Sequence, residues 1–93
     1  MLEKKIESHL REGIRNLGGL CLKFTSPSMA GVPDRIILLK GRIIFVELKS
    51  WSGHVTPIQT RTHEGMRNQG ADVRVLKGLV EVKKFLEELR SEI

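Results

Sequence analysis

Three charged side chains stand at the ends of two neighbouring apolar runs. Asp34 precedes the run Ile36–Leu39, and Glu47 and Lys49 close the run Ile43–Val46. Because strand side chains alternate between faces, Glu47 and Lys49 share one face if their run is extended. If the two runs pair as strands, Asp34 reaches the same side. Two carboxylates and an ammonium group then converge. These are the functional groups that a divalent-metal hydrolase acting on phosphodiesters requires at least.

The donor atoms in this segment suit a hard cation. Mg²⁺ takes oxygen ligands in octahedral geometry and keeps several waters. Asp34, Glu47 and the backbone carbonyl of Leu48 would make an open oxygen site of this kind, with Lys49 holding the attacking water or offsetting charge on the phosphate. Taken one at a time, these residues read as an exposed strand ion pair and an aspartate that starts a turn. Their convergence favours the metal interpretation.

Further polar side chains stand on two expected helices. Gln59 falls in the first turn of the second one, where a helix start attracts phosphate and an amide can orient water or substrate. Glu3 and Glu7 lie one turn apart on the first helix, and either could lend a carboxylate to a metal-bound water. The alternatives are an exposed glutamine and surface glutamates paired with Lys4 or Arg11.

The elements that must position these residues follow from apolar spacing and turn residues. Helical periodicity predicts a first helix over residues 2–17, ended by Gly18-Gly19. Short apolar runs predict strands over 20–24, 34–39, 42–49 and 72–76, with Lys40-Gly41 as a tight hairpin turn. Thr56 and Pro57 begin a helix that continues over 58–68, and Gly78 breaks the chain before a last helix over 79–89. The order α-β-β-β-α-β-α indicates an α/β fold, a mixed sheet flanked by helices.

Composition bounds the possible functions. A chain of 93 residues predicts one domain over 1–93. The net charge of +5 and pI of about 9.8 favour a polyanionic partner, most often nucleic acid, over a domain that is basic by chance. Cys21 has no second cysteine to pair with, so a reducing, cytoplasmic location is expected. No apolar run approaches the length of a membrane span, and the amphipathic N-terminus does not read as a signal peptide.

The three histidines do not suggest a metal cluster. His9, His54 and His63 lack the spacing of a helical zinc site. His54 and His63 stand close enough to the charged segment along the chain to touch phosphate, but we expect incidental structural roles for them.

Four segments carry a resemblance to a known family. They are, in chain order, Gly-Gly-Leu-Cys-Leu-Lys-Phe, Gly-Val-Pro-Asp-Arg-Ile-Ile, Phe-Val-Glu-Leu-Lys-Ser and Thr-Pro-Ile-Gln. Together they resemble a stand-alone virus-type replication-repair nuclease (VRR-NUC) domain of the PD-(D/E)XK nuclease superfamily. The resemblance covers nearly the whole chain and implies a restriction-endonuclease-like fold.

The resemblance also implies a function for the charged segment. It implies an endodeoxyribonuclease in which Asp34 and Glu47 bind Mg²⁺ or Mn²⁺ and Lys49 and Gln59 complete the catalytic set. A glutamate of the first helix would assist, and both Glu3 and Glu7 remain candidates. Stand-alone members resemble Holliday-junction resolvases, which implies a homodimer that cuts branched DNA, encoded by a phage or its bacterial host.

Rival interpretations remain open from the sequence. One is a flap or general duplex nuclease without junction preference. Another is a DNA-binding module whose nuclease site has decayed, although the complete Asp-Glu-Lys set argues against decay. A third is a basic interaction domain without a nucleic-acid role. The dimer interface is equally open, with the exposed face of the last helix and the loop around Trp51 as candidates.

Overall fold

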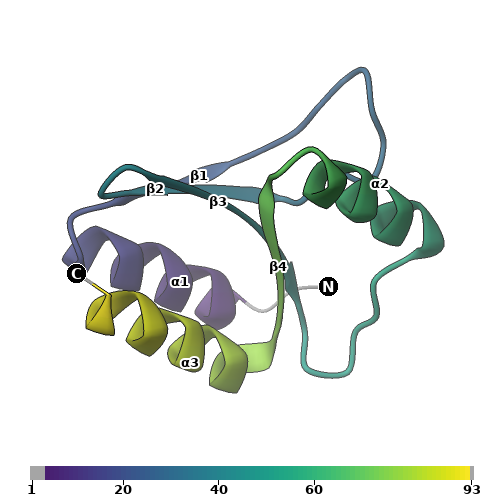
Figure 1. The fold of residues 1–93 in the computed structure, drawn as a ribbon. Helices are drawn as coiled ribbons and strands as arrows, with labels where there is room; N and C mark the ends of the chain where they lie inside the picture. The colour runs from purple at the N-terminus through teal and green to yellow at the C-terminus, as the bar shows by residue number, and fades with distance from the viewer. Residues whose placement is uncertain (1–3, 93) are drawn as a thin grey trace.

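The chain forms seven elements in the order predicted. The structure, a computed structural model, describes residues 4–92. Its elements are α1 (Lys4–Asn16), β1 (Leu20–Lys23), β2 (Arg35–Leu39), β3 (Arg42–Lys49), α2 (Pro57–Asn68), β4 (Asp72–Lys77) and α3 (Gly78–Ser91) (Figure 1). The predicted α/β class is therefore confirmed. Within the described residues, no helix has the length and apolar character needed to cross a membrane.

The four strands make one mixed sheet. Their order is β1-β2-β3-β4, with antiparallel pairs β1/β2 and β2/β3 and a parallel pair β3/β4. Lys40 and Gly41 both have positive φ angles, 49° and 82°, as a tight hairpin turn between β2 and β3 requires. The parallel pair needs a crossover, and α2 supplies it.

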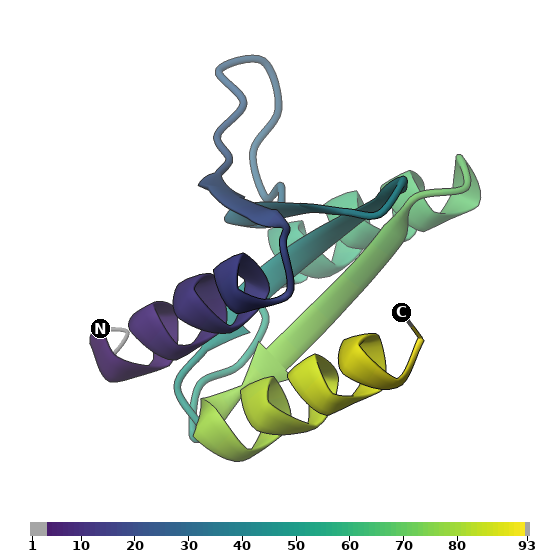
Figure 2. The ribbon, with the colours of Figure 1, turned by 90° about the vertical axis from the view of Figure 1, so that its left-hand side faces the viewer.

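The main core lies between the sheet and the two terminal helices. Figures 1 and 2 show α1 and α3 side by side on one face of the sheet. The apolar spacing of α1 puts Ile6, Leu10 and Ile14 against this core, all 3% exposed or less. A Cβ atom at Gly13 would lie 2.4 Å from the Leu86 side chain, so the absence of a side chain there lets α1 and α3 approach closely.

Several boundaries differ from the sequence-based expectation. The first strand ends at Lys23, and Asp34 precedes β2 instead of belonging to it. β4 extends to Lys77, and α3 begins at Gly78 without an intervening loop, so this glycine joins two elements instead of separating them. Its φ of +78° and a Cβ position 2.8 Å from the Trp51 Cβ explain why glycine suits this junction.

Candidate active site

The β2–β3 pairing brings the two carboxylates together. Arg35 of β2 lies opposite Val46 of β3, so Asp34 and Glu47 come next along the same two antiparallel strands. Both side chains fall on the sheet face that carries α2, because alternation puts Ile36 and Phe45 there as well. The Asp34 Oδ1 atom accepts a hydrogen bond from the Leu48 backbone N–H at 3.1 Å.

Burial makes both carboxylates costly to ionise. Burial raises the pKa of Asp34 above 3.8, and hydrogen bonding to the Leu48 N–H and the nearby Arg35 only partly oppose this. The pKa of Glu47 is raised above 4.5 by burial first and by the negative charge of Asp34 second, with Lys49 acting in the opposite direction. Two adjacent carboxylates of this kind would gain from a bound cation.

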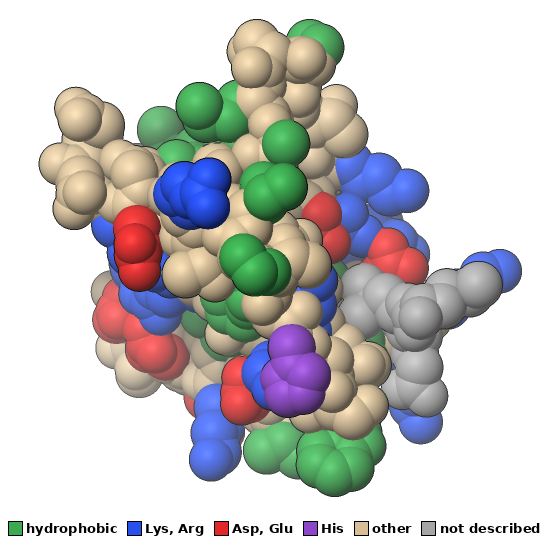
Figure 3. All heavy atoms as spheres, turned by 90° about the vertical axis from the view of Figure 1, so that its right-hand side faces the viewer, with side chains coloured by type: hydrophobic (Ala, Val, Ile, Leu, Met, Phe, Trp, Pro, Cys, Tyr) green, Lys and Arg blue, Asp and Glu red, His purple; other side chains and the backbone are tan. Residues whose placement is uncertain are grey.

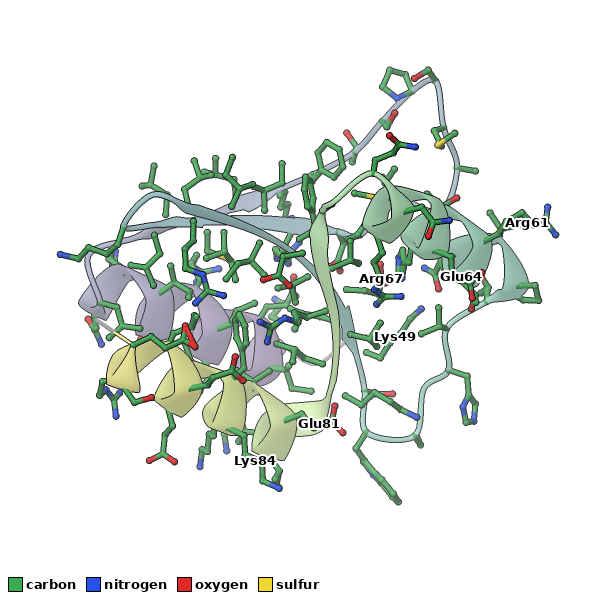
Figure 4. All side chains as sticks on the ribbon, in the orientation of Figure 1. Lys49, Arg61, Glu64, Arg67, Glu81 and Lys84 are labelled. Atoms are coloured by element: carbon green, nitrogen blue, oxygen red, sulfur yellow. The ribbon has the colours of Figure 1, made fainter. Side chains whose placement is uncertain are left out.

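Lys49 and Gln59 meet the same oxygen of Glu47. The Lys49 Nζ atom lies 3.6 Å from Glu47 Oε2. The Gln59 Nε2 atom donates to that oxygen at 3.3 Å. Figure 4 shows the Lys49 side chain beneath α2. The convergence expected for Asp34, Glu47, Lys49 and Gln59 is therefore present in the fold.

The start of α2 fixes the orientation of Gln59. Its backbone N–H donates to the Thr56 hydroxyl oxygen at 3.2 Å, and its side-chain oxygen accepts from the Thr56 backbone N–H at 3.0 Å. This reciprocal pair is a capping box. Because the cap occupies the amide oxygen, the amide nitrogen is left facing Glu47. Local helix capping thus positions a side chain of the candidate site.

His63 is a site residue that sequence reasoning missed. It is 1% exposed, and its Nε2 atom lies 3.9 Å from Glu47 Oε1. Within the described residues, neither atom has a hydrogen-bond partner. Burial and the neighbouring Arg67 lower the pKa of His63, which favours the neutral imidazole. The available signal was spacing, since His63 lies one helical turn after Gln59 and therefore on the same face.

Gly31 sets the distance between the preceding loop and α2. Its φ is +86°, and a Cβ atom there would lie 2.8 Å from the Ile58 carbonyl oxygen and 2.9 Å from the Thr62 hydroxyl. That hydroxyl donates to the Ala30 carbonyl at 2.7 Å. The glycine of the Gly-Val-Pro-Asp segment therefore allows α2 to dock tightly, and α2 carries both Gln59 and His63 to Glu47.

The first-helix glutamates lie differently from the expectation. Glu3 is outside the described residues. Glu7 forms an ion pair with Arg35, not with Lys4 or Arg11. The same guanidinium donates to the Asp34 backbone carbonyl at 3.1 Å. The negative charge of Glu7 also raises the pKa of Asp34, although less than burial does.

The donor set fits a hard divalent cation that keeps waters. Within residues 4–92, no three or more His, Cys, Asp or Glu side chains form a ready-made metal cage. Mg²⁺ sites need only one or two carboxylates beside waters and substrate oxygens. Asp34 and Glu47 supply these, the Leu48 carbonyl is an additional oxygen, and Glu47 keeps a buried oxygen without a hydrogen bond among the described residues. These oxygen donors therefore suit a hard divalent cation.

Comparisons with known proteins agree with this geometry. No family model matches the chain. A curated protein of Acyrthosiphon pisum secondary endosymbiont phage 1, named "Putative nuclease p44", is 45% identical over 75 residues, covering 80% of this chain and 81% of that protein. A solved structure described as a VRR_NUC domain aligns with a TM-score of 0.84 at 34% identity, covering 91% of this chain and 94% of the other. A second, described as a VRR_NUC domain protein, aligns with a TM-score of 0.69 at 18% identity over 94% of this chain and 86% of the other, and shows a shared fold. The chain therefore belongs to the VRR-NUC family.

Proposed function

We propose that this chain is a Mg²⁺- or Mn²⁺-dependent endodeoxyribonuclease that cuts branched DNA as a homodimer. The observation that carries the proposal is the half-buried Asp34 beside the buried Glu47, with Lys49 and Gln59 on one oxygen of Glu47. Family membership and a phage relative whose printed name is a nuclease support the same chemistry.

Each side chain has a role in this proposal. Asp34, Glu47 and the Leu48 carbonyl would hold the metal. A cation held there would supply Lewis-acid chemistry, polarising the scissile phosphate and making water more acidic. The Lys49 ammonium orients the attacking water and stabilises negative charge that develops on the phosphate. Gln59 acts through Glu47 by holding its Oε2 atom, and a first-helix glutamate, Glu3 or Glu7, would assist.

The charge and the size of the chain support a DNA substrate and a dimer. A net charge of +5 on 93 residues favours binding to phosphates. One small domain offers a short DNA footprint, whereas a two-fold dimer places two sites against two strands of a junction. A phage relative and one free thiol, Cys21, support a place in the reducing cytoplasm of a bacterial host.

A cleavage assay on three DNA structures tests this proposal. The chain is incubated with a four-way junction, a flap and a linear duplex, each in Mg²⁺, in Mn²⁺ and in EDTA, with Asp34→Ala as control. The proposal expects paired symmetric cuts in the junction that need metal and Asp34. Equal cutting of all three substrates would keep the nuclease and remove the junction preference. No metal-dependent cutting would favour a DNA-binding module.

A further inference from the structure

The loop after β3 presents a tryptophan to solvent. Trp51 is the one tryptophan of the sequence and is 81% exposed, more than any other exposed large hydrophobic side chain of the described residues. It follows Lys49 of the candidate active site by two residues. The loop of residues 50–56 extends beyond the end of the sheet, on the side of the molecule that carries α2 (Figure 1). Tryptophan is highly buried on average in folded proteins, so an indole this exposed indicates a binding role.

Close contacts fix the backbone beneath this indole. The Gly53 N–H donates to the Ser50 carbonyl at 2.9 Å, which closes a tight turn around Trp51. A Cβ atom at Gly78 would lie 2.8 Å from the Trp51 Cβ atom and 3.3 Å from its Cα atom. The glycine at the β4–α3 junction therefore lets the loop dock against both elements. An exposed ring on an anchored backbone loses little conformational freedom when it binds a partner.

Trp51 also lines an apolar hollow. The hollow has a volume of about 420 Å³, and pockets for small molecules measure about 300–1,000 Å³. Leu79 and Val80 of α3 and the start of α1, at Ile6, supply aliphatic lining. Val80 is itself 65% exposed. An aromatic and aliphatic lining of this kind suits a flat, uncharged ring.

Two lysines link this hollow to the candidate active site. The parallel register pairs Lys49 with Lys77 at the ends of β3 and β4, so both side chains start from the same sheet face. Lys49 contacts Glu47, and Lys77 lines the hollow. Figure 3 faces the side onto which the loop projects, and it shows hydrophobic side chains at the lower edge next to Lys, Arg and His side chains. A strand whose phosphates follow the two ammonium groups brings its bases to Trp51.

We propose that an unpaired base of the DNA substrate enters this hollow and stacks on Trp51. The inference rests on the nuclease proposed above and names the part of the substrate that the loop reads. Base–aromatic stacking tolerates any sequence, since every base has a π face. A base inside a duplex is already stacked on both sides and reaches such a pocket only by leaving the helix. Trp51 therefore favours branched, flapped or melted DNA over a paired duplex.

Charge argues for nucleic acid as the occupant. The net charge of +5 and the paired lysines beside the hollow favour a polyanion with a flat apolar part, which describes a nucleotide. Among the described residues that line the hollow, none is acidic. Glu81, in the first turn of α3, accepts from the Lys77 backbone N–H at 2.7 Å. A second copy of the chain would instead bring its own positive charge against these lysines.

The fluorescence of Trp51 tests the proposal directly, because the sequence holds no other tryptophan and no tyrosine. The protein in EDTA is titrated with two duplexes of equal length, one fully paired and one with a central bubble of unpaired thymines. EDTA prevents cleavage by the proposed nuclease during the titration. We expect bubble DNA to quench the Trp51 emission strongly, and paired DNA, which is bound through its phosphates, to leave the emission nearly unchanged.

Substitutions of Trp51 separate stacking from simple apolar contact. Trp51→Leu keeps an apolar side chain without a π face, Trp51→Phe keeps a smaller ring, and Ile43→Ala is the control, because Ile43 is 59% exposed near the opposite end of β3. Anisotropy of fluorescein-labelled DNA gives each Kd, and far-UV circular dichroism melts verify that each variant folds. We expect Trp51→Leu to bind bubble DNA about 5–100-fold more weakly and paired DNA with an unchanged Kd. Trp51→Phe should lose less, and Ile43→Ala should lose nothing.

Other results would overturn the inference. Emission that responds equally to both duplexes would do so, as would a folded Trp51→Leu that binds bubble DNA as tightly as the wild type. Emission that changes with protein concentration in the absence of DNA would assign the ring to a contact between copies. Emission that shifts on phosphatidylglycerol vesicles and not on DNA would assign it to a lipid surface.

Cleavage of the same DNAs in Mn²⁺ separates this inference from the proposed function. Cutting without a response of the Trp51 emission would keep the nuclease and remove the stacking site. Quenching by bubble DNA without any cutting would keep the stacking site and remove the nuclease.

Discussion

Replacing Glu47 by glutamine should stabilise the metal-free protein while removing the proposed metal site. In the native chain, Glu47 Oε1 and His63 Nε2 are 3.9 Å apart and both lack a partner among the described residues. The His63 ring hydrogen-bonds to the Gly31 backbone, which places the proton of the neutral imidazole on Nδ1 and leaves a lone pair on Nε2. Two acceptors therefore face each other. Glu47→Gln replaces one acceptor by an NH₂ group that can donate to His63, and the new carbonyl can still accept from Gln59. The substitution also removes the negative charge beside Asp34.

The expected size of this gain follows from the contacts that change. A buried polar atom without a partner costs about 1–3 kcal/mol. The variant loses the ion pair with Lys49, whose atoms are 3.6 Å apart. The pair is largely buried, so the cost of desolvating the Glu47 carboxylate offsets most of its attraction to Lys49, and Lys49, which is 20% exposed, can still reach water. We therefore take the net loss as about 0–1 kcal/mol. We therefore expect a net gain of about 1 kcal/mol in unfolding free energy, or a Tm increase of about 4–8 °C for a chain of this size.

Thermal unfolding in EDTA and in Mn²⁺ measures both effects. We expect Glu47→Gln to melt above the wild type in EDTA at pH 7, and Mn²⁺ to raise the Tm of the wild type but not that of Glu47→Gln. His54→Gln is the matched control, because His54 is exposed and should change neither result. A Glu47→Gln variant that melts below the wild type in EDTA would show that the facing Glu47 and His63 atoms do not destabilise the native fold.

Further predictions concern the docking of α2, the pH dependence and Lys49. Gly31→Ala should lower the unfolding free energy by about 1–3 kcal/mol, because Gly31 has a positive φ and a Cβ atom there would clash with α2. Gly65→Ala should raise the unfolding free energy by about 0.5–1 kcal/mol, because the space around a Cβ atom at Gly65 is open. Urea melts of the two variants measure both changes. Because burial raises the pKa values of Asp34 and Glu47, these groups stabilise the metal-free fold below their ordinary values of 3.8 and 4.5, and that stability is lost as the pH rises through the higher folded values. Melts in EDTA from pH 4 to pH 7 should show this loss in the wild type and a smaller loss in Glu47→Gln. Lys49→Ala should reduce the cleavage rate about 10²–10³-fold with little change in Mn²⁺ affinity, measured by single-turnover assays and calorimetry; full activity would remove Lys49 from the mechanism.

Local signals made much of the fold predictable. The strand over 42–49 has the predicted bounds because its apolar run is closed by charges at both ends. The Lys40-Gly41 turn and the Thr56–Gln59 capping box are set by neighbouring residues, and both occur in the structure. The charged trio converges because strand alternation and hairpin register follow directly from the same short segment.

Contacts between distant segments were not predictable in this way. His63 looks incidental in the sequence, and it is buried because α2 docks on the loop that contains Gly31. Glu7 forms its ion pair with Arg35 of β2 and not with a charged residue of its own helix. The docking of α2 also explains why this helix has few apolar residues. Among the described residues, the side chain that α2 buries is His63, which faces the Glu47 carboxylate.

The cleavage rate of a four-way junction under single-turnover conditions in Mn²⁺ tests whether Asp34 and Glu47 form a metal-dependent nuclease site. The wild type, Asp34→Asn, Glu47→Gln and His54→Gln are compared at equal folded concentration, each with an EDTA control. We expect metal-dependent cutting by the wild type and His54→Gln, and none by the two carboxylate variants. Cutting by folded Asp34→Asn at the wild-type rate, or cutting by the wild type in EDTA, would contradict it.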